Sequence, residues 1–310
     1  MNAQTQKAIQ PSYSLPATTR LGHVHLTVAD LDRQLGFYQK VLNMQLHWRK
    51  GSSAGLGAGE HDLLRLTEVP GARRAHHTTG LYHLALRYPS RKELARAAAR
   101  LFALDYPNAP TDHVVSESIY VEDPEGQSIE LYLLTLQRGT IEVADGKLSV
   151  RRADGKPATG VDPLDVEDLL KEVAPFEQLD RPLPKGTTLG HVNLWTANID
   201  DEMHFFHDVL GFMKGPVATN MHSAEVGLST ELPHVIPFNT WQGKNAPPPP
   251  PNSLGIRYFT IVVPDAGELD RVLARVHHEG IATAETAEGI LVRDPARIGI
   301  VLNAAGDPGT

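Results

Sequence analysis

Three side chains of the types that bind transition metals occur at similar places in the sequence: His83 in YHLALRYP, Glu130 in QSIELYL and His191 in GHVNL. Each one alternates with aliphatic residues, which is the pattern of a β-strand that turns one face toward a core. We therefore expect all three to point away from the aliphatic face. Taken singly, each is explained as a polar residue on a half-solvated antiparallel sheet. Together, two histidines and one carboxylate form the facial triad that suits non-haem Fe(II).

An internal repeat strengthens this combination. The segment LGHVHLTVADLDRQLGFYQKVLNMQ matches LGHVNLWTANIDDEMHFFHDVLGFM further along the chain, and the match superposes His23 on His191. More faintly, YHLALRYPSRKELARAAARL matches RYFTIVVPDAGELDRVLARV, and EDPEGQSIELYL matches RDPARIGIVLNA. Equivalent strands in different modules thus carry ligand-type side chains, and curved sheets would bring their faces together. The chain is interpreted as two half-chains of two modules each.

Each module is predicted to have the order βαβββ. A strand of alternating residues comes first, and in module one a helix follows with apolar residues at Leu31, Leu35, Tyr38 and Leu42, the stripe of a helix packed on one side. Short strands with turn signals such as Asp-Pro-Glu-Gly come next. The predicted fold is α+β, with four modules forming two pseudo-symmetric curved mixed sheets. The modules span residues 21–67, 80–135, 188–242 and 255–304.

The repeat also divides the chain. Residues 1–19 are interpreted as a flexible N-terminal tail, and residues 20–135 as the first half with modules one and two. Residues 136–187 form a connector, in which VADGKLSVRRADGK indicates a hairpin and Pro163–Val173 a short amphipathic helix. Residues 188–310 form the second half with modules three and four.

Composition narrows the class of protein. The chain has a net charge of −8 and no basic run, which makes nucleic acid a poor candidate for a partner. It has no cysteine, so disulfides and thiolate metal sites are excluded. The sequence shows no apolar run of the length that a signal peptide or a membrane span requires. We expect a cytoplasmic protein without a membrane partner, and a homo-oligomer stays open.

Five segments carry a resemblance to a known family: GHVHLTVADLDRQLGFYQKVLNM, GLYHLALRYPSRKELA, DHVVSESIYVEDPEGQSIELY, GHVNL and the pair FNTWQGKNAPP with YFTIVVPD. On these motifs the chain resembles the vicinal-oxygen-chelate superfamily, which includes glyoxalases, fosfomycin-resistance proteins and extradiol dioxygenases. The third and fifth segments are similar in particular to the catechol 2,3-dioxygenase branch found in bacilli. The resemblance covers all of the chain except the tail and the connector, and it implies the fold that the repeat predicts.

The resemblance also implies a ligand set. In such enzymes a histidine on the first strand of each of two paired modules and a glutamate on the last strand of one hold the metal. Carried over, module two supplies His83 and Glu130. Relatives with this layout pair module two with module three, which favours His191 as the third ligand, and His23 is the alternative if module one is the partner. The implied metal is Fe(II), with Mn(II) as the alternative.

Two further site residues follow from the same comparison of motifs. Relatives carry a tyrosine ten residues before the glutamate, which is Tyr120 here, and a histidine upstream of it, which is His113. His113 would act as general acid or base because histidine is the side chain that most often transfers protons near neutral pH, and His234 is the next candidate. Module four has Tyr258 and Val301 where module two has its metal ligands, so no second triad is expected.

The function implied is an extradiol ring-cleaving dioxygenase that acts on a catechol-type aromatic with O2. Two alternatives share the scaffold. One is a glyoxalase-like metal-dependent isomerase or lyase, which would usually carry a second carboxylate or Gln/Glu pair on the paired strands. The other is a non-catalytic protein that binds or sequesters a small molecule, and such relatives usually lose the ligands.

Overall fold

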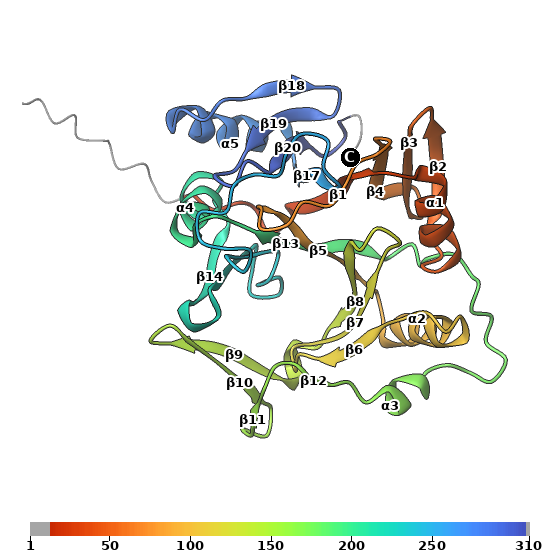
Figure 1. Ribbon diagram of the computed structural model, residues 1–310. Helices are drawn as coiled ribbons and strands as arrows, with labels where there is room; N and C mark the ends of the chain where they lie inside the picture. Colours follow the sequence, from red (N-terminus) through yellow and green to blue (C-terminus); the bar gives the residue numbers. More distant parts are fainter. Residues whose placement is uncertain (1–12, 308–310) are drawn as a thin grey trace, which may run out of the picture.

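The computed structural model describes residues 13–307, and its main elements are two large mixed sheets with helices on their outer faces (Figure 1). The first sheet has eight strands and combines module one with module four. In spatial order its strands are β18 (Ala284–Thr286), β19 (Gly289–Arg293), β20 (Gly299–Ala304), β17 (Gly255–Val263), β1 (Arg20–Val28), β4 (His61–Glu68), β3 (Ser53–Ala58) and β2 (Gln45–Lys50).

The second sheet has nine strands and combines module two with module three. Its order is β12 (Asp162–Pro163), β6 (Ala109–Asp112), β7 (Ser116–Glu122), β8 (Ser128–Leu134), β5 (Gly80–Arg87), β13 (Thr188–Trp195), β16 (Ile236–Asn239), β15 (Ser223–Gly227) and β14 (Met213–Ala218). In both sheets the first strands of two modules pair antiparallel at the centre. The predicted α+β class with two mixed sheets is confirmed.

The helices begin at side-chain caps and bury one face. They are α1 (Leu31–Lys40), α2 (Arg91–Ala103), α4 (Ile199–Met203), which continues as the π-helical turn η2 (His204–Val209), and α5 (Ala266–His278). The Asp30 carboxylate accepts a hydrogen bond from the backbone N–H of Arg33 at 2.9 Å, which satisfies one free donor of the first turn of α1. The apolar stripe predicted for this helix is buried, with every member at most 5% exposed.

The connector forms a small sheet of its own from β9 (Gly139–Ala144), β10 (Lys147–Arg152) and β11 (Pro157–Ala158). The 3-10 turn η1 (Leu136–Arg138) precedes this sheet, and α3 (Val166–Leu170) follows it. The 3-10 turn η3 (Thr219–Met221), which belongs to module three, packs against β10. Asp145 and Gly146 both have positive φ, as a two-residue hairpin turn requires. The helix is shorter than expected. Pro163 pairs with Thr111 in the nine-stranded sheet, and the Asp165 cap delays the first turn to Val166.

The flexible tail was predicted too long. Residues 1–12 lie outside the described residues, but residues 13–19 pack against the second half of the chain. Leu15 is 6% exposed, and its backbone N–H donates to the carbonyl of Gly211 at 2.8 Å. The hydroxyl of Tyr13 hydrogen-bonds to Glu268, and the Arg275 guanidinium lies 4.9 Å from the Tyr13 ring centre. These contacts of two apolar side chains hold residues 13–19 against the fold, although the polar composition of the segment predicted a flexible tail.

A buried pair of carboxyls lies where modules three and four meet. Glu202 is 0% exposed, and one of its oxygens accepts hydrogen bonds from the Thr196 hydroxyl at 2.7 Å and the Ala296 N–H at 3.0 Å. Asp294 is 2% exposed and accepts from the Ile298 N–H at 2.7 Å. The second oxygen of each carboxyl has no hydrogen-bond partner among the described residues. A buried oxygen without a donor is costly when it is charged, which favours the protonated carboxyl.

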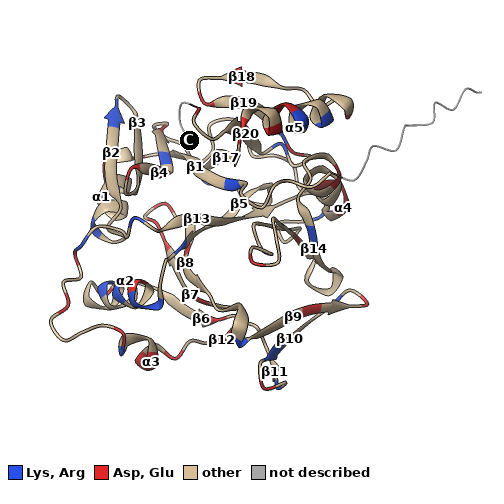
Figure 2. Cartoon of the chain, turned by 180° about the vertical axis from the view of Figure 1, so that it is seen from behind, with Lys and Arg blue, Asp and Glu red and all other residues tan. Residues whose placement is uncertain are grey.

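Acidic and basic residues alternate along much of the chain. Figure 2 shows the basic and acidic residues interspersed along helices and strands, with no continuous basic face in that view. Among residues 13–307, no helix combines the length and the apolar character that crossing a membrane requires.

Candidate metal centre

Three adjacent strands of the nine-stranded sheet, β8, β5 and β13, carry the predicted ligands. The backbone register places Ala85 of β5 opposite His191 on one side and opposite Glu130 on the other, and it places His83 opposite Asn193. Because side chains two apart on a strand share a face, His83 and Ala85 point the same way. His83, Glu130 and His191 therefore share one face of the sheet, and the small Ala85 leaves room between them.

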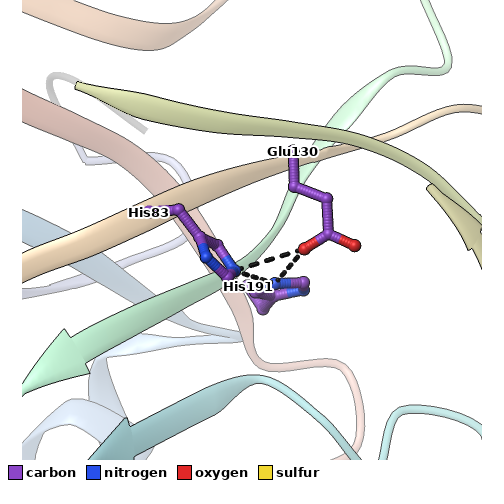
Figure 3. Close-up of side chains that lie close together, drawn as sticks. All are labelled: His83, Glu130 and His191. Carbon is purple, nitrogen blue, oxygen red and sulfur yellow. Dashed lines mark hydrogen bonds and ion pairs between the residues drawn. The ribbon is translucent and has the colours of Figure 1, made fainter. Parts of the chain in front are cut away.

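The ligand atoms of the three side chains converge (Figure 3). The distance from His83 Nε2 to His191 Nε2 is 2.9 Å. The Oε2 atom of Glu130 lies 3.2 Å from His83 Nε2 and 3.0 Å from His191 Nε2. His23, the alternative third ligand, lies in the other sheet beside Glu288. The structure thus brings His191 rather than His23 to the two residues of module two.

This spacing fits a metal ion bound on one face of an octahedron. For metal–ligand bonds of about 2.1 Å, two ligands at a right angle stand about 3.0 Å apart. All three separations between the ligand atoms lie close to that value. Within the range 13–307 this is also the only group of three His, Cys, Asp or Glu side chains with ligand atoms this close together. The donor set suggests a metal cofactor.

Burial and charge prepare the three groups for a cation. All three are at most 4% exposed. Burial lowers the pKa of His191 to about 3, against the opposing effect of Glu130, so its ring is neutral and its nitrogen is free to bind a metal. Burial raises the pKa of Glu130, but its interactions with His191 and His83 outweigh that effect and keep the pKa well below its usual value. The centre therefore offers two nitrogen lone pairs and one anion.

Neighbouring side chains orient the carboxylate and define the face of the site. The Ser118 hydroxyl donates to Glu130 Oε1 at 2.6 Å, which leaves Oε2 for the two histidines. The Tyr120 ring lies edge-on to His83 at 5.6 Å between ring centres. Burial raises the pKa of Tyr120, and the Glu130 charge raises it further, so this side chain keeps its hydroxyl proton.

His113 reaches this centre through Tyr120. Its Nδ1 lies 2.5 Å from the carbonyl oxygen of Gly160 in the connector, and its Nε2 lies 3.0 Å from the Tyr120 hydroxyl. A carbonyl oxygen only accepts, so Nδ1 carries a proton and, in the neutral ring, Nε2 accepts the proton of Tyr120. His113 is therefore hydrogen-bonded to a residue of the site, one step from the ligands. Its role in proton transfer stays a prediction.

A second histidine lies closer to the ligands. The His234 ring is 4.7 Å from the His191 ring, and its Nδ1 pairs with the Glu225 carboxylate. Burial lowers the pKa of His234, but Glu225 and then Glu130 outweigh it and raise the pKa above its ordinary value. His234 was predicted as the reserve candidate for the general base, and Glu225 was not predicted. The alternation of Glu225 with Ala224 and Val226 in SAEVG was the available signal.

A cavity of about 490 Å³ is lined by Tyr106, Tyr120 and Ser128, at the end of β7 and the start of β8, and its volume lies within the range of small-molecule sites. Tyr82 lies next to His83, and it packs against Trp195 and Trp241 at 5.5 Å and 5.3 Å between ring centres. Aromatic and hydroxyl side chains thus border the converging ligands.

The chain is similar to known proteins over most of its length. The model of the Glyoxalase/Bleomycin resistance protein/Dioxygenase superfamily matches residues 20–131. A catechol-2,3-dioxygenase of Bacillus subtilis (strain 168) is 36% identical over 287 residues, which covers 91% of this chain and 96% of that protein. The chain belongs to this superfamily. A 3-methylcatechol 2,3-dioxygenase of Pseudomonas putida is 29% identical over 124 residues, 36% of this chain and 40% of that one.

Solved structures share the superfamily fold. Glyoxalase I from Zea mays matches with a TM-score of 0.55 at 16% identity and covers 92% of each chain. A Bacillus subtilis protein of known structure matches with a TM-score of 0.62 at 12% identity, over 96% of this chain and 87% of that one. At these identities the likeness shows the fold alone.

The two sheets of this superfamily member differ at equivalent positions. In the eight-stranded sheet, Tyr258 and Val301 occupy the places of His83 and Glu130. A carboxylate still lies beside His23, but it belongs to Glu288, which lies between β18 and β19. Its oxygens lie 3.2 Å from His23 Nε2 and 2.6 Å from Arg65 Nη1. A guanidinium thus provides the positive charge that balances this carboxylate. Among the described residues, this sheet holds no ligand triad.

Proposed function

We propose that this chain is an extradiol ring-cleaving dioxygenase, which opens a catechol-type aromatic with O2 at an Fe(II) centre. The observation that carries the proposal is the convergence of His83, Glu130 and His191 to within 3.2 Å of one another. A triad of this composition leaves one side of the metal open for a substrate and for oxygen. The similarity to a catechol-2,3-dioxygenase over nearly the whole chain supports the same reaction class.

His83, Glu130 and His191 would hold the metal, and when bound it would supply Lewis acidity toward the two hydroxyls of the diol and a path for electrons to O2. The protein's own contribution is to position and to exclude water. The ligands are almost fully buried, so charges on the substrate are poorly screened by solvent. The ring of Tyr82 lies 4.9 Å from the ring of His83 between centres and provides a flat surface near the ligands, which suits an aromatic ring.

Proton transfer has two candidates on different elements. A catechol must lose a proton to bind through both oxygens, and a histidine with a pKa near neutrality is the usual acceptor. His113 acts through the Tyr120 hydroxyl, because Nε2 accepts from that oxygen. His234 lies against His191 and carries Glu225 on its other ring nitrogen, which stabilises the protonated ring. We assign His113 with Tyr120 to one side of the substrate and His234 to the other.

Oxygen uptake by the iron-loaded protein tests the proposal. The full-length protein is loaded anaerobically with Fe(II), and consumption of O2 and formation of yellow product are followed with a panel of catechols. One O2 should be consumed per ring opened, and both atoms of labelled O2 should enter the product as the carbon–carbon bond beside the diol breaks. Glu130→Gln should be inactive. An iron-loaded protein that consumes no O2 with any catechol, but isomerises the hemithioacetal of methylglyoxal and glutathione, would establish the glyoxalase alternative instead.

A further inference from the structure

A second cavity, of about 810 Å³, lies apart from the three metal ligands. It is bounded by the strands of module four, by the loop before β5 and by the proline-rich segment before β17. The pyrrolidine rings of Pro248, Pro249, Pro250 and Pro251 form part of its wall. A run of prolines is stiff, so this wall is formed before any ligand arrives. The volume lies within the range of small-molecule sites.

The charges around this cavity are one-sided. Four arginines line it, namely Arg74, Arg257, Arg293 and Arg297, and Glu288 is the one acidic residue of the lining. Within the part of the chain that the structure describes, none of the four has a carboxylate within ion-pair distance. Arg74 and Arg293 instead donate hydrogen bonds to the backbone carbonyls of Glu125 and Arg297. The whole chain has a net charge of −8, so a cavity lined by four arginines without acidic partners differs in sign from the protein as a whole.

The single acid does not neutralise the arginines of the lining. Glu288 is already bound by Arg65, which lies deeper, and by His23. Burial raises the pKa of Glu288, but His23, Arg65 and Tyr258 outweigh it and lower the pKa to about 2, so this carboxylate is an anion whose nearest positive charge is Arg65 rather than an arginine of the lining. Arg257, Arg293 and Arg297 are exposed and Arg74 is half-buried, and among the described residues none of the four has a carboxylate partner, so together they give the cavity a positive potential. A concave site with low-dielectric walls concentrates such a potential.

The lining combines polar side chains with an apolar part. Leu81, Ile256, Leu291 and Val301 line the cavity with the ring of Trp195. Apolar surface of this kind favours a hydrocarbon or ring body over an inorganic ion. Guanidinium groups bind planar carboxylates through two parallel hydrogen bonds. A ligand that satisfies both features has an apolar, preferably aromatic, body and one carboxylate.

We propose that this cavity is a binding site for small aromatic carboxylates, separate from the metal centre. The carboxylate pairs with the arginines of the lining, and the ring lies against the apolar wall and the proline run. The site does not depend on the proposed dioxygenase activity, because it contains none of the ligands of the metal.

Binding of 2-naphthoate and of its neutral isostere 2-naphthamide to the full-length protein tests this proposal by calorimetry. We expect one naphthoate per chain, with the amide at least about tenfold weaker, because it cannot form charge-assisted pairs with the arginines. The Arg257→Gln/Arg293→Gln double variant should bind naphthoate at least about tenfold more weakly. The matched control is Arg151→Gln, which removes the same kind of charge from the exposed hairpin of the connector and should bind as the wild type does.

Measurements with and without Fe(II) locate the binding. Equal affinity in metal-free and metal-loaded protein is expected for a separate site. Loss of binding on removal of the metal would place naphthoate at the metal centre and overturn the proposal, as would equal affinities for naphthoate and naphthamide or an unchanged affinity in the double variant. If the double variant does not fold, Arg297→Gln alone should show a smaller loss in the same direction, and unchanged binding there would count against the site.

Discussion

Replacing Glu202 by glutamine should remove part of the pH dependence of stability. Burial raises the pKa of Glu202 well above its ordinary value, and Asp294 adds to the rise. Burial also raises the pKa of Asp294, to about 8. In the unfolded chain both carboxyls titrate near pH 4. Between these limits the folded protein holds protons on this pair that the unfolded chain has released, and Glu202→Gln has one fewer such proton.

The magnitude follows from linkage. A proton bound only in the folded state means that the free energy of unfolding falls as pH rises, by about 1.4 kcal/mol per pH unit. The contribution of Glu202 is fully present below the unfolded pKa and is lost as pH rises toward the folded pKa. From pH 6 to pH 8 the wild type should therefore lose about 2.7 kcal/mol more than the variant. For a chain of this length that corresponds to a difference of about 4 °C in Tm.

Thermal or urea unfolding of metal-free protein at pH 6, 7 and 8 measures the effect. The chain offers a matched control, because Gln34 is the buried residue of module one that the internal repeat aligns with Glu202. Gln34→Glu places a carboxyl near the buried Asp123 and should increase the pH dependence. Parallel stability curves for wild type and Glu202→Gln would show that Glu202 is ionised in the folded protein and would refute the reasoning.

Three further predictions concern the metal centre and the N-terminal segment. Metal analysis should give one ion per wild-type chain. The ion should be lost in Glu130→Gln and His191→Ala but kept in His23→Ala, and the reverse result for the two histidines would mean that module one, not module three, supplies the third ligand. His113→Gln should keep iron while its turnover number falls on the order of 10²–10⁴-fold in steady-state kinetics, whereas a wild-type rate would leave this histidine a structural role. Leu15→Ala should lower the free energy of unfolding by about 2–3 kcal/mol. An unchanged denaturation midpoint would mean that this segment adds nothing to stability, as expected of a flexible tail.

The module fold was predictable because its signals are local and repeated. Alternation along a strand places His83 and Glu130 on the face opposite the aliphatic residues, and the repeat shows that His23 and His191 hold the same position in their modules. Which of these two histidines joins module two is a question of sheet pairing. The repeat makes modules one and three alike, so residue patterns do not decide it, and only the antiparallel pairing of β5 with β13 does.

Side chains that reach the site from loops or distant strands were harder to foresee. Glu288 lies between two short strands, and nothing in TAEGI indicates that its carboxylate meets His23. The contact of His234 with His191 depends on how the strands of module three curve around the centre. Tyr13 and Leu15 are isolated apolar residues in a polar stretch, and their burial depends on a surface formed some two hundred residues later.

The pairing of module one with module four has a consequence for synthesis. The two sheets are nested, with the inner pair contiguous in the chain and the outer pair made of its first and last modules. During synthesis β1 lacks its partner β17 until more than two hundred further residues have emerged from the ribosome. At typical elongation rates this takes on the order of ten seconds or more. During that interval the inner pair can already assemble the three ligands, while the edge of β1 stays open to other strands. The outer pair is therefore the part of this molecule that most needs protection by a chaperone.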